Sequence, residues 1–137
     1  MVDKRIADFI GRHHILTLAT SVEGEPYCAA CFYAYDKERN LFIFTSDTTT
    51  RHGKEMEENA NVALSIALET RVVGRIQGLQ IVGKAQRGDS KAQATYIKRF
   101  PYTAVVPLSL WMVAPTMMKL TDNTLGFGKK LIWESEE

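Results

Sequence analysis

Residues 13–46, HHILTLATSVEGEPYCAACFYAYDKERNLFIFTS, decide the fold. They contain three runs of β-branched, aliphatic and aromatic residues at 13–20, 26–35 and 41–46, with turn residues at Glu23-Gly24 and at 36–40 between them. The first run is apolar at both odd and even positions, as expected for a strand covered on both faces. Such runs with short turns between them predict three consecutive antiparallel strands.

The flanking segments predict short helices and further strands. Helices are expected at 3–10, at 51–58 and from Ser90 to the residue before Pro101, and strands at 62–68, 72–87 and 108–121. Asp3 caps the first helix and Gly11 follows it, while Ser90 and Gln93 form a capping-box pair. The glycines within 72–87 indicate bulges or bends, which a closing barrel needs. The expected fold is mainly β with short helices, an antiparallel barrel whose ends the helices plug.

The composition narrows the function classes. The chain has 137 residues, 45% of them hydrophobic and 24% charged, and this fits a single domain over residues 1–137. A net charge of +1 gives no broad field for a nucleic-acid backbone. No apolar run is long enough to span a membrane, and the first residues lack the pattern of a signal peptide. We expect a cytoplasmic protein that binds neither nucleic acid nor membranes.

Cys28 and Cys31 form a C-x-x-C pattern within the second predicted strand. Side chains three apart on a strand point to opposite faces, so the two thiols cannot share a metal ion or a disulfide there. The three histidines lack the spacing of a zinc site. We therefore expect no metal site and predict that both cysteines are packing residues.

The residues from Thr45 to His52, TSDTTTRH, lie between a predicted strand and a predicted helix. A helix N-terminus offers free backbone N–H groups and the positive end of the helix dipole, and hydroxyls with an arginine add donors suited to a phosphate. An equally weighted alternative is that a threonine caps the helix while Arg51 and His52 face water. Ser46, Asp47 and His52 are rejected as a nucleophilic triad, because no nucleophile-elbow motif surrounds them.

A glycine-containing run, Gly74 to Gln80, places glutamines on a predicted strand. The amides of Gln77 and Gln80 offer donors and acceptors suited to the edge of a heterocycle, although a solvent-facing strand explains Gln80 equally well. The tail contains G-x-G at 126–128 but lacks the remaining glycine or lysine pattern of either nucleotide-binding motif. Dinucleotide-binding and P-loop folds are therefore rejected.

Several of these segments occur together in a known family. The residues concerned are His14 to Thr20, Gly24-x-Pro26, Thr45-Ser46 with Thr50-Arg51-His52, Gln77-Gly78 and Gly83. In this order they resemble the FMN-binding split barrels related to pyridoxamine 5'-phosphate oxidase. Arg99-Phe100-Pro101 and the tail from Lys119 to Trp133 resemble an uncharacterised branch of small bacterial proteins in that family.

The resemblance implies a six-stranded antiparallel Greek-key split β-barrel that forms a homodimer, with one FMN in each of two clefts at the interface. It assigns the phosphate to Thr45, Ser46, Thr50 and Arg51, with His52 as a helper. It places Phe32 and Tyr33 along the flavin ring, Gln77 and Gly78 near its edge, and Lys119 and Asn123 as partner-chain residues. No protein residue is assigned as catalytic.

The function implied is that of an FMN-binding, flavin-dependent oxidoreductase acting on an unknown small molecule. The alternative is a non-enzymatic flavin or haem binding module, or a redox sensor, with the same fold. Vitamin B6 oxidation is not predicted, because Asn123 stands where the oxidases have a basic residue that reads the substrate phosphate.

Overall fold

The computed structural model describes residues 1–136 and contains three α-helices, seven strands and three short 3-10 turns. The helices are α1 (Lys4–Arg12), α2 (Arg51–Glu58) and α3 (Ser90–Arg99). The strands are β1 (Ile15–Val22), β2 (Glu25–Asp36), β3 (Leu41–Thr45), β4 (Asn61–Ala67), β5 (Gln77–Arg87), β6 (Leu110–Asp122) and β7 (Lys130–Glu134). The 3-10 turns are Val73–Arg75, Pro101–Val105 and Asn123–Leu125.

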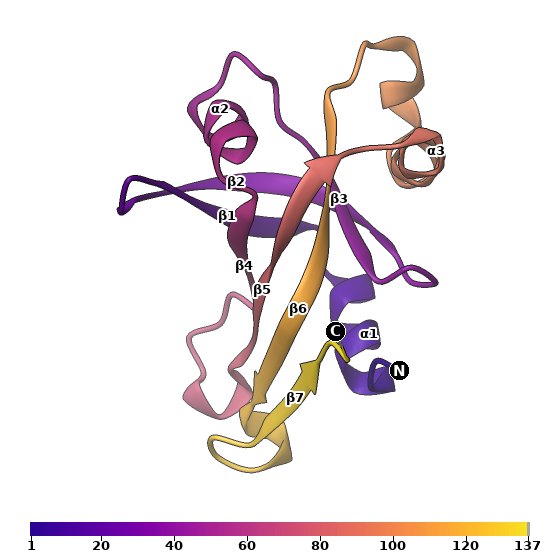
Figure 1. Ribbon diagram of the computed structural model, residues 1–137. Helices are drawn as coiled ribbons and strands as arrows, with labels where there is room; N and C mark the ends of the chain where they lie inside the picture. Colours follow the sequence, from indigo (N-terminus) through magenta and orange to yellow (C-terminus); the bar gives the residue numbers. More distant parts are fainter. Residues whose placement is uncertain (137) are drawn as a thin grey trace.

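All seven strands belong to one antiparallel sheet, which closes on itself through its first six strands (Figure 1). The order is β3-β2-β1-β4-β5-β6-β7, and an additional pairing of β3 with β6 closes the barrel. The meander β1-β2-β3 followed by β4 beside β1 is a Greek key. The predicted six-stranded antiparallel split barrel is confirmed, and β7 is an extra strand paired only with β6.

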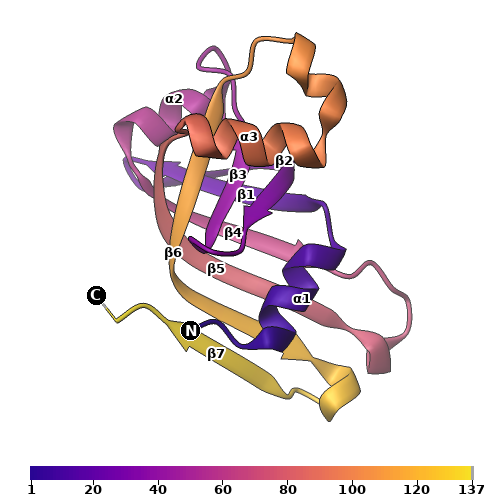
Figure 2. The same ribbon diagram turned by 90° about the vertical axis from the view of Figure 1, so that its right-hand side faces the viewer.

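The barrel core is filled from the inward-facing positions of the strands and closed by two helices. Ile6, Phe9 and Ile10 of α1 are fully buried in it, and Met56 enters from α2. A second apolar cluster lies outside the barrel wall, where Ala92 and Tyr96 of α3 pack on β2, β3 and β6. Figure 2 shows α3 lying across the upper part of the barrel and α1 beside its lower part. The apolar residues whose spacing predicts a helix at 3–10 are therefore the ones that α1 contributes to the core.

Four local predictions need correction. Residues 72–76 are not strand, because Val73–Arg75 is a 3-10 turn and β5 begins at Gln77. The cap of α3 is Asp89, whose side chain accepts from the Ala92 N–H, rather than Ser90. Helix α1 continues through Gly11 to Arg12. The two cysteines do lie on opposite faces, but only Cys31 is buried and Cys28 is exposed.

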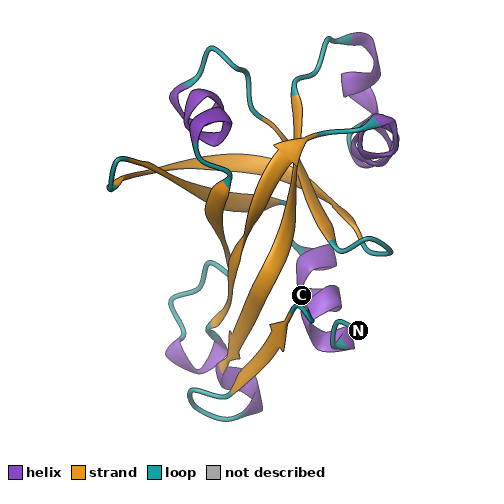
Figure 3. Ribbon diagram, viewed as in Figure 1, coloured by secondary structure: helices purple, strands orange, loops and turns teal. Residues whose placement is uncertain are grey.

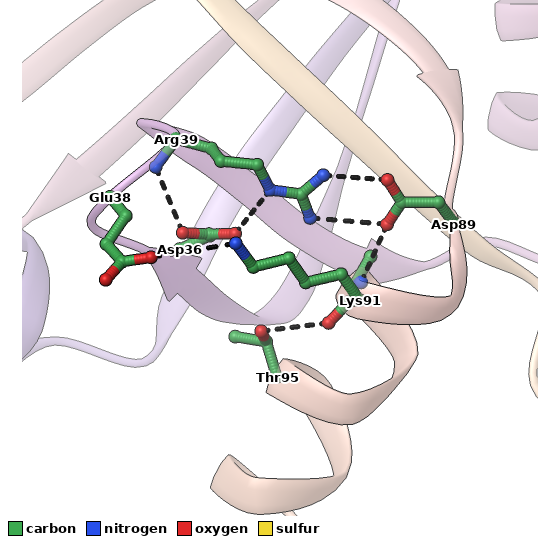
Figure 4. A network of polar contacts seen from close by, with 7 residues as sticks. Asp36, Glu38, Arg39, Asp89, Lys91 and Thr95 are labelled. Atoms are coloured by element: carbon green, nitrogen blue, oxygen red, sulfur yellow. Dashed lines mark hydrogen bonds and ion pairs between the residues drawn. The ribbon is translucent and has the colours of Figure 1, made fainter.

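The turn between β2 and β3 is fastened to α3 by one arginine (Figure 4). Arg39 donates from Nε to Asp36 at 2.6 Å and from its two Nη atoms to Asp89 at 2.7 and 3.2 Å. The side-chain hydrogen bond from Arg39 lowers the pKa of Asp89 to about 2. Burial alone would raise the pKa of Asp36, but the hydrogen bonds from Arg39 lower it overall.

This arrangement predicts an acid-sensitive contribution to stability. A carboxylate whose pKa is lowered by folding stabilises the fold above its ordinary pKa, here 3.8, and that contribution is lost as the pH falls toward about 2. Arg39→Gln should therefore unfold at lower denaturant than the unmodified protein at pH 7. The difference should shrink between pH 4 and pH 2, as measured by urea unfolding at several pH values. A difference that is constant with pH would contradict the assignment.

Candidate functional site

The junction between β3 and α2 is held against β6 by its backbone. Ser46 is 2% exposed, its N–H donates to the Ser109 carbonyl at 2.9 Å, and its carbonyl accepts from Trp111 Nε1 at 3.1 Å. Thr50 caps α2, because its hydroxyl oxygen accepts from the Gly53 N–H at 3.2 Å. The backbone path from Ser46 to Gly53 is therefore fixed, and the first turn of α2 begins at a defined place.

His52 folds back from α2 onto this junction. Its Nδ1 lies 2.5 Å from the Ser46 hydroxyl, and burial lowers the pKa of His52, which favours a neutral ring at pH 7. Within residues 1–136, Nε2 and the backbone N–H groups of Arg51 and His52 have no hydrogen-bond partner. Asp47 accepts from the Thr49 N–H and does not contact His52, so Ser46 and His52 do not form part of a triad.

Arg51 is engaged by a carboxylate that the sequence analysis did not consider. Its Nε donates to Glu55 at 2.6 Å, and its guanidinium lies 4.3 Å from the centre of the Tyr27 ring. Glu55 is 9% exposed and also accepts from the Thr20 hydroxyl at 2.9 Å. The hydrogen bond that Arg51 donates to Glu55 lowers the pKa of Glu55 and raises the pKa of Arg51. The i, i+4 spacing of the two residues in α2 could have predicted this pair.

The Arg51–Glu55 pair borders a hollow of about 510 Å³. Thr49 and Lys54 lie on its α2 side, and Val22 and Glu25 lie on the side of the β1–β2 hairpin. The Arg51 side chain is 52% exposed, so the remaining N–H groups of its guanidinium are accessible positive donors beside the Lys54 ammonium. The junction thus supplies hydroxyl, imidazole, guanidinium and free backbone donors, which suit an anion.

The other predicted polar residues gather at the opposite end of the barrel, as Figures 1 and 3 show. Gln77 and Gly78 begin β5, and Gly78 pairs with Thr121 near the end of β6. Asn123 is fastened there by hydrogen bonds to the Val73 carbonyl and from the Gly128 N–H, and Gln77 accepts from Arg12. Lys119 pairs with Gln80 and lies two residues before Thr121 in β6.

The seven residues of β4 separate the two groups, since α2 ends just before Asn61 and Ala67 pairs with Gly78. At a rise of about 3.3 Å per residue, this is a separation of about 20 Å. A single chain therefore does not bring the Thr45–His52 group and the Gln77–Asn123 group together.

Phe32 and Tyr33 point to opposite faces of β2. Phe32 is 50% exposed and lies near His14 and Phe100, with each ring centre 6.0 Å away. Tyr33 is 1% exposed within the barrel and donates from its hydroxyl to the Ile10 carbonyl at 2.6 Å. Burial raises the pKa of Tyr33. Phe32 is available to a ligand on the outer face, and Tyr33 is not, so the two cannot line one ring as predicted.

The outer face of β1, β2, β4, β5 and β6 is accessible and composed largely of small side chains. We call it the open outer face, and it consists of two rows across the sheet: Ala30, Thr17, Ser65, Gln80 and Lys119, and Cys28, Ala19, Ala63, Val82 and Met117. Lys119 is the one charged residue in these rows. Faces of this kind, without carboxylates and with short side chains, suit close contact with another surface.

Comparisons with known proteins place the chain. Residues 2–121 match the family model described as pyridoxamine 5'-phosphate oxidase. The chain belongs to this family. A UPF0306 protein of Photorhabdus laumondii is 38% identical over 130 residues, which cover 92% of this chain and 91% of that protein. The resemblance to an uncharacterised bacterial branch of the pyridoxamine 5'-phosphate oxidase-like proteins is thereby confirmed.

Solved structures share the fold at low sequence identity. A pyridoxamine 5'-phosphate oxidase-related, FMN-binding protein of Nostoc punctiforme has a TM-score of 0.74 and 12% identity, with 98% of this chain and 90% of that chain covered. A heme-binding protein of Mycobacterium smegmatis has a TM-score of 0.74 and 15% identity, with 92% of this chain and 55% of that chain covered. This chain thus spans about half the length of the mycobacterial protein.

Within residues 1–136, no helix is both long enough and apolar enough to cross a membrane. The same residues contain no group of three histidine, cysteine or acidic side chains arranged to hold a metal ion.

Proposed function

We propose that this family member binds FMN between two copies of the chain and acts as a flavin-dependent oxidoreductase on a small molecule. The observation that carries the proposal is the donor set at the β3–α2 junction. Free N–H groups of Arg51 and His52, the Nε2 atom of His52 and the remaining guanidinium N–H groups suit a phosphate. This donor set fits FMN, whose terminal phosphate needs such a place.

The second part of the proposal is that the site needs a partner chain. Gln77, Gly78, Lys119 and Asn123 lie at the far end of the barrel from the junction, so they can serve the same ligand only if they come from a second copy. The open outer face supports such contact, since it extends over both halves of the barrel and carries few charges. Phe32 lies beside this face and would contact the flavin ring.

When bound, FMN supplies the hydride chemistry, and the protein supplies position and electrostatics. Arg51 and His52 hold the anionic end, and Ser46 fixes the His52 side chain. Glu55 occupies one of the Arg51 N–H groups. Lys119 and Gln77 are the donors that would stabilise negative charge on the reduced ring. Thr50 caps α2, so its contribution to the phosphate is indirect. Tyr33 is left out of the proposed site because it is buried in the barrel.

One observation favours a second candidate function, a haem-binding module. His14 is exposed and lies 6.0 Å from the Phe32 ring in a nearly parallel stack. An accessible imidazole beside an aromatic ring is the kind of group that holds haem iron. His14 would be the ligand, and no turnover is required of such a module.

A spectrum and a titration test the proposal. The purified full-length protein should absorb near about 450 nm or acquire this band when FMN is added, because the cofactor carries the chromophore. Sedimentation of the FMN-loaded protein should give the mass of two chains. A Soret band would favour haem, and a protein that stays colourless and monomeric at saturating FMN would refute the proposal. Bleaching of the flavin by NADH or NADPH would distinguish an oxidoreductase from a carrier.

A further inference from the structure

A second hollow of about 810 Å³ lies between α1, the β2–β3 turn and α3, and we call it the α1–α3 groove. Figure 2 shows α1, α3 and the β2–β3 turn on the same side of the barrel. Ala7 and Ile10 of α1 and Tyr33 and Ala34 of β2 line its inner part. The α1–α3 groove shares no lining residue with the hollow at Arg51, so the proposed FMN site does not account for it.

The inner part of the groove offers almost no polar group. The Tyr33 hydroxyl already donates to the Ile10 carbonyl at 2.6 Å, which satisfies both groups. Ala7 and Ala34 contribute only methyl groups beside the backbone. A ligand that enters the groove would therefore place an apolar part against α1 and β2.

Positive side chains surround the groove on all three sides. They are Arg12 from α1, Lys37 from the β2–β3 turn, and Lys91, Lys98 and Arg99 from α3. The groove also contains three carboxylates, but each is already paired: Asp8 with Lys4 at 2.6 Å, Asp36 with Arg39 at 2.6 Å and Glu38 with Lys91 at 3.6 Å. Each acidic group is thus neutralised by a cation. Two of these cations, Lys4 and Arg39, are not among the five that surround the groove.

Among the remaining cations, Lys37 and Arg12 interact with the Asp8 carboxylate only through longer-range electrostatics, and Lys98 and Arg99 have no carboxylate partner within residues 1–136. Lys37 and Lys98 form no ion pair there, Arg12 donates to the Gln77 amide, and Arg99 donates to the His13 carbonyl at 3.3 Å. A set of unpaired cations around an apolar floor is complementary to an anion attached to an apolar body.

The walls of the groove are held before any ligand arrives. Arg39 links Asp36 of β2 to Asp89, which caps α3, and Lys91 reaches Glu38 across the same gap (Figure 4). On the other side, Arg99 joins the end of α3 to the residue that follows α1. A preformed site loses less ordering entropy on binding, so a small ligand can be held with few contacts.

From this combination we infer that the α1–α3 groove is a binding site for a small organic anion, a carboxylate or phosphate on an apolar body. The anionic group lies between Lys37 and Lys98, and the apolar part lies against Ala7 and Tyr35. Ile10 and Ala34 lie behind them and are 0% and 3% exposed. The groove volume suits a ligand of this size and is too small for a folded partner. This site shares no lining residue with the hollow at Arg51, and it adjoins the proposed flavin site only where Arg12 donates to Gln77.

The test uses the full-length protein, labelled with ¹⁵N and saturated with FMN, and four probes. Benzoate and phenyl phosphate carry both features of the ligand, benzyl alcohol carries only the apolar body, and inorganic phosphate carries only the charge. Both aromatic anions should give saturable NMR shifts at Lys37, Lys98 and neighbouring groove residues. Each should bind at least threefold tighter than benzyl alcohol and inorganic phosphate. The better of the two identifies the head group.

The Lys37→Gln, Lys98→Gln double variant should weaken binding of both aromatic anions three- to tenfold, since two exposed charge contacts are lost. Neither lysine has an ion pair in the described chain, so the fold should be retained. The matched control is Lys129→Gln with Lys130→Gln, which changes the net charge equally and should leave binding unchanged. Equal weakening in both double variants, equal binding of inorganic phosphate, or shifts confined to the Arg51 region would overturn the inference.

Discussion

Gly53→Ala is expected to disrupt the candidate site and lower stability more than any other single-methyl change in α2. A Cβ atom at this position would lie 2.3 Å from the Asp47 carbonyl oxygen and 3.1 Å from the Ser46 hydroxyl. The first contact involves backbone and cannot be relieved by a side-chain rotation. Overpacking of this kind costs about 1 to 3 kcal/mol, which lowers the melting temperature by roughly 3 to 10 °C in a chain of this size.

The same change should move Ser46 and His52 apart, so FMN binding should be lost together with stability. Thermal unfolding and FMN titration of the variant measure the two effects. Gly11→Ala is the matched control, because nothing lies within 4 Å of the added methyl group and Gly11 is inside α1. It should be neutral or stabilise the protein by about 0.5 to 1 kcal/mol. If Gly53→Ala behaves like Gly11→Ala, the junction is not as tightly packed as described.

Arg51→Ala is expected to raise the FMN dissociation constant at least about tenfold, since a hydrogen bond to a charged group contributes roughly 1.5 to 3 kcal/mol. Glu55→Gln should have the opposite effect and lower the FMN dissociation constant about threefold. The Glu55 carboxylate competes with the phosphate for Arg51, and the amide would release this competition while keeping the bond from Thr20. Fluorescence titration with FMN measures both constants.

Glu58→Gln serves as the control for charge. It removes one negative charge beside the same hollow, but Glu58 makes no contact with Arg51 and should leave FMN affinity nearly unchanged. Glu55→Gln should lose its effect when Arg51 is already alanine. An unchanged FMN dissociation constant for Arg51→Ala would mean that the phosphate does not bind at the β3–α2 junction.

The order of helices and strands along the chain was accessible from the sequence because these elements have strong local patterns, whereas the Greek-key arrangement of the strands followed from the family resemblance. The run from His13 to Ser46 alternates apolar runs with turn residues, and Ile6, Phe9 and Ile10 mark the buried face of α1. The segments that were not predicted correctly have weak or misleading sequence patterns. Residues 72–76 are as apolar as a strand, yet Val73–Arg75 turns where no partner strand is paired with it. Strand β7 is short, half-exposed and paired on one side only.

The candidate site was predictable in its residue types but not in its partners. Hydroxyls, Arg51 and His52 at a helix start indicated an anion site, and the structure supplies donors there. Glu55 was missed because an acidic residue one helical turn after an arginine is usually solvent-exposed. Here the Glu55 carboxylate is buried and accepts from the Thr20 hydroxyl. Tyr33 was misplaced because strand alternation puts it and Phe32 on opposite faces. The α1–α3 groove depends on three segments far apart in sequence.

The placement of the two polar groups at opposite ends of the barrel has a genetic consequence in the proposed dimer. A chain with Arg51→Ala and a chain with Lys119→Ala would each form a homodimer in which both clefts carry a lesion. Mixing the two would produce heterodimers with one doubly defective cleft and one intact cleft. Inactive proteins of these two kinds should therefore complement each other when coexpressed, whereas two lesions at the same end of the barrel should not.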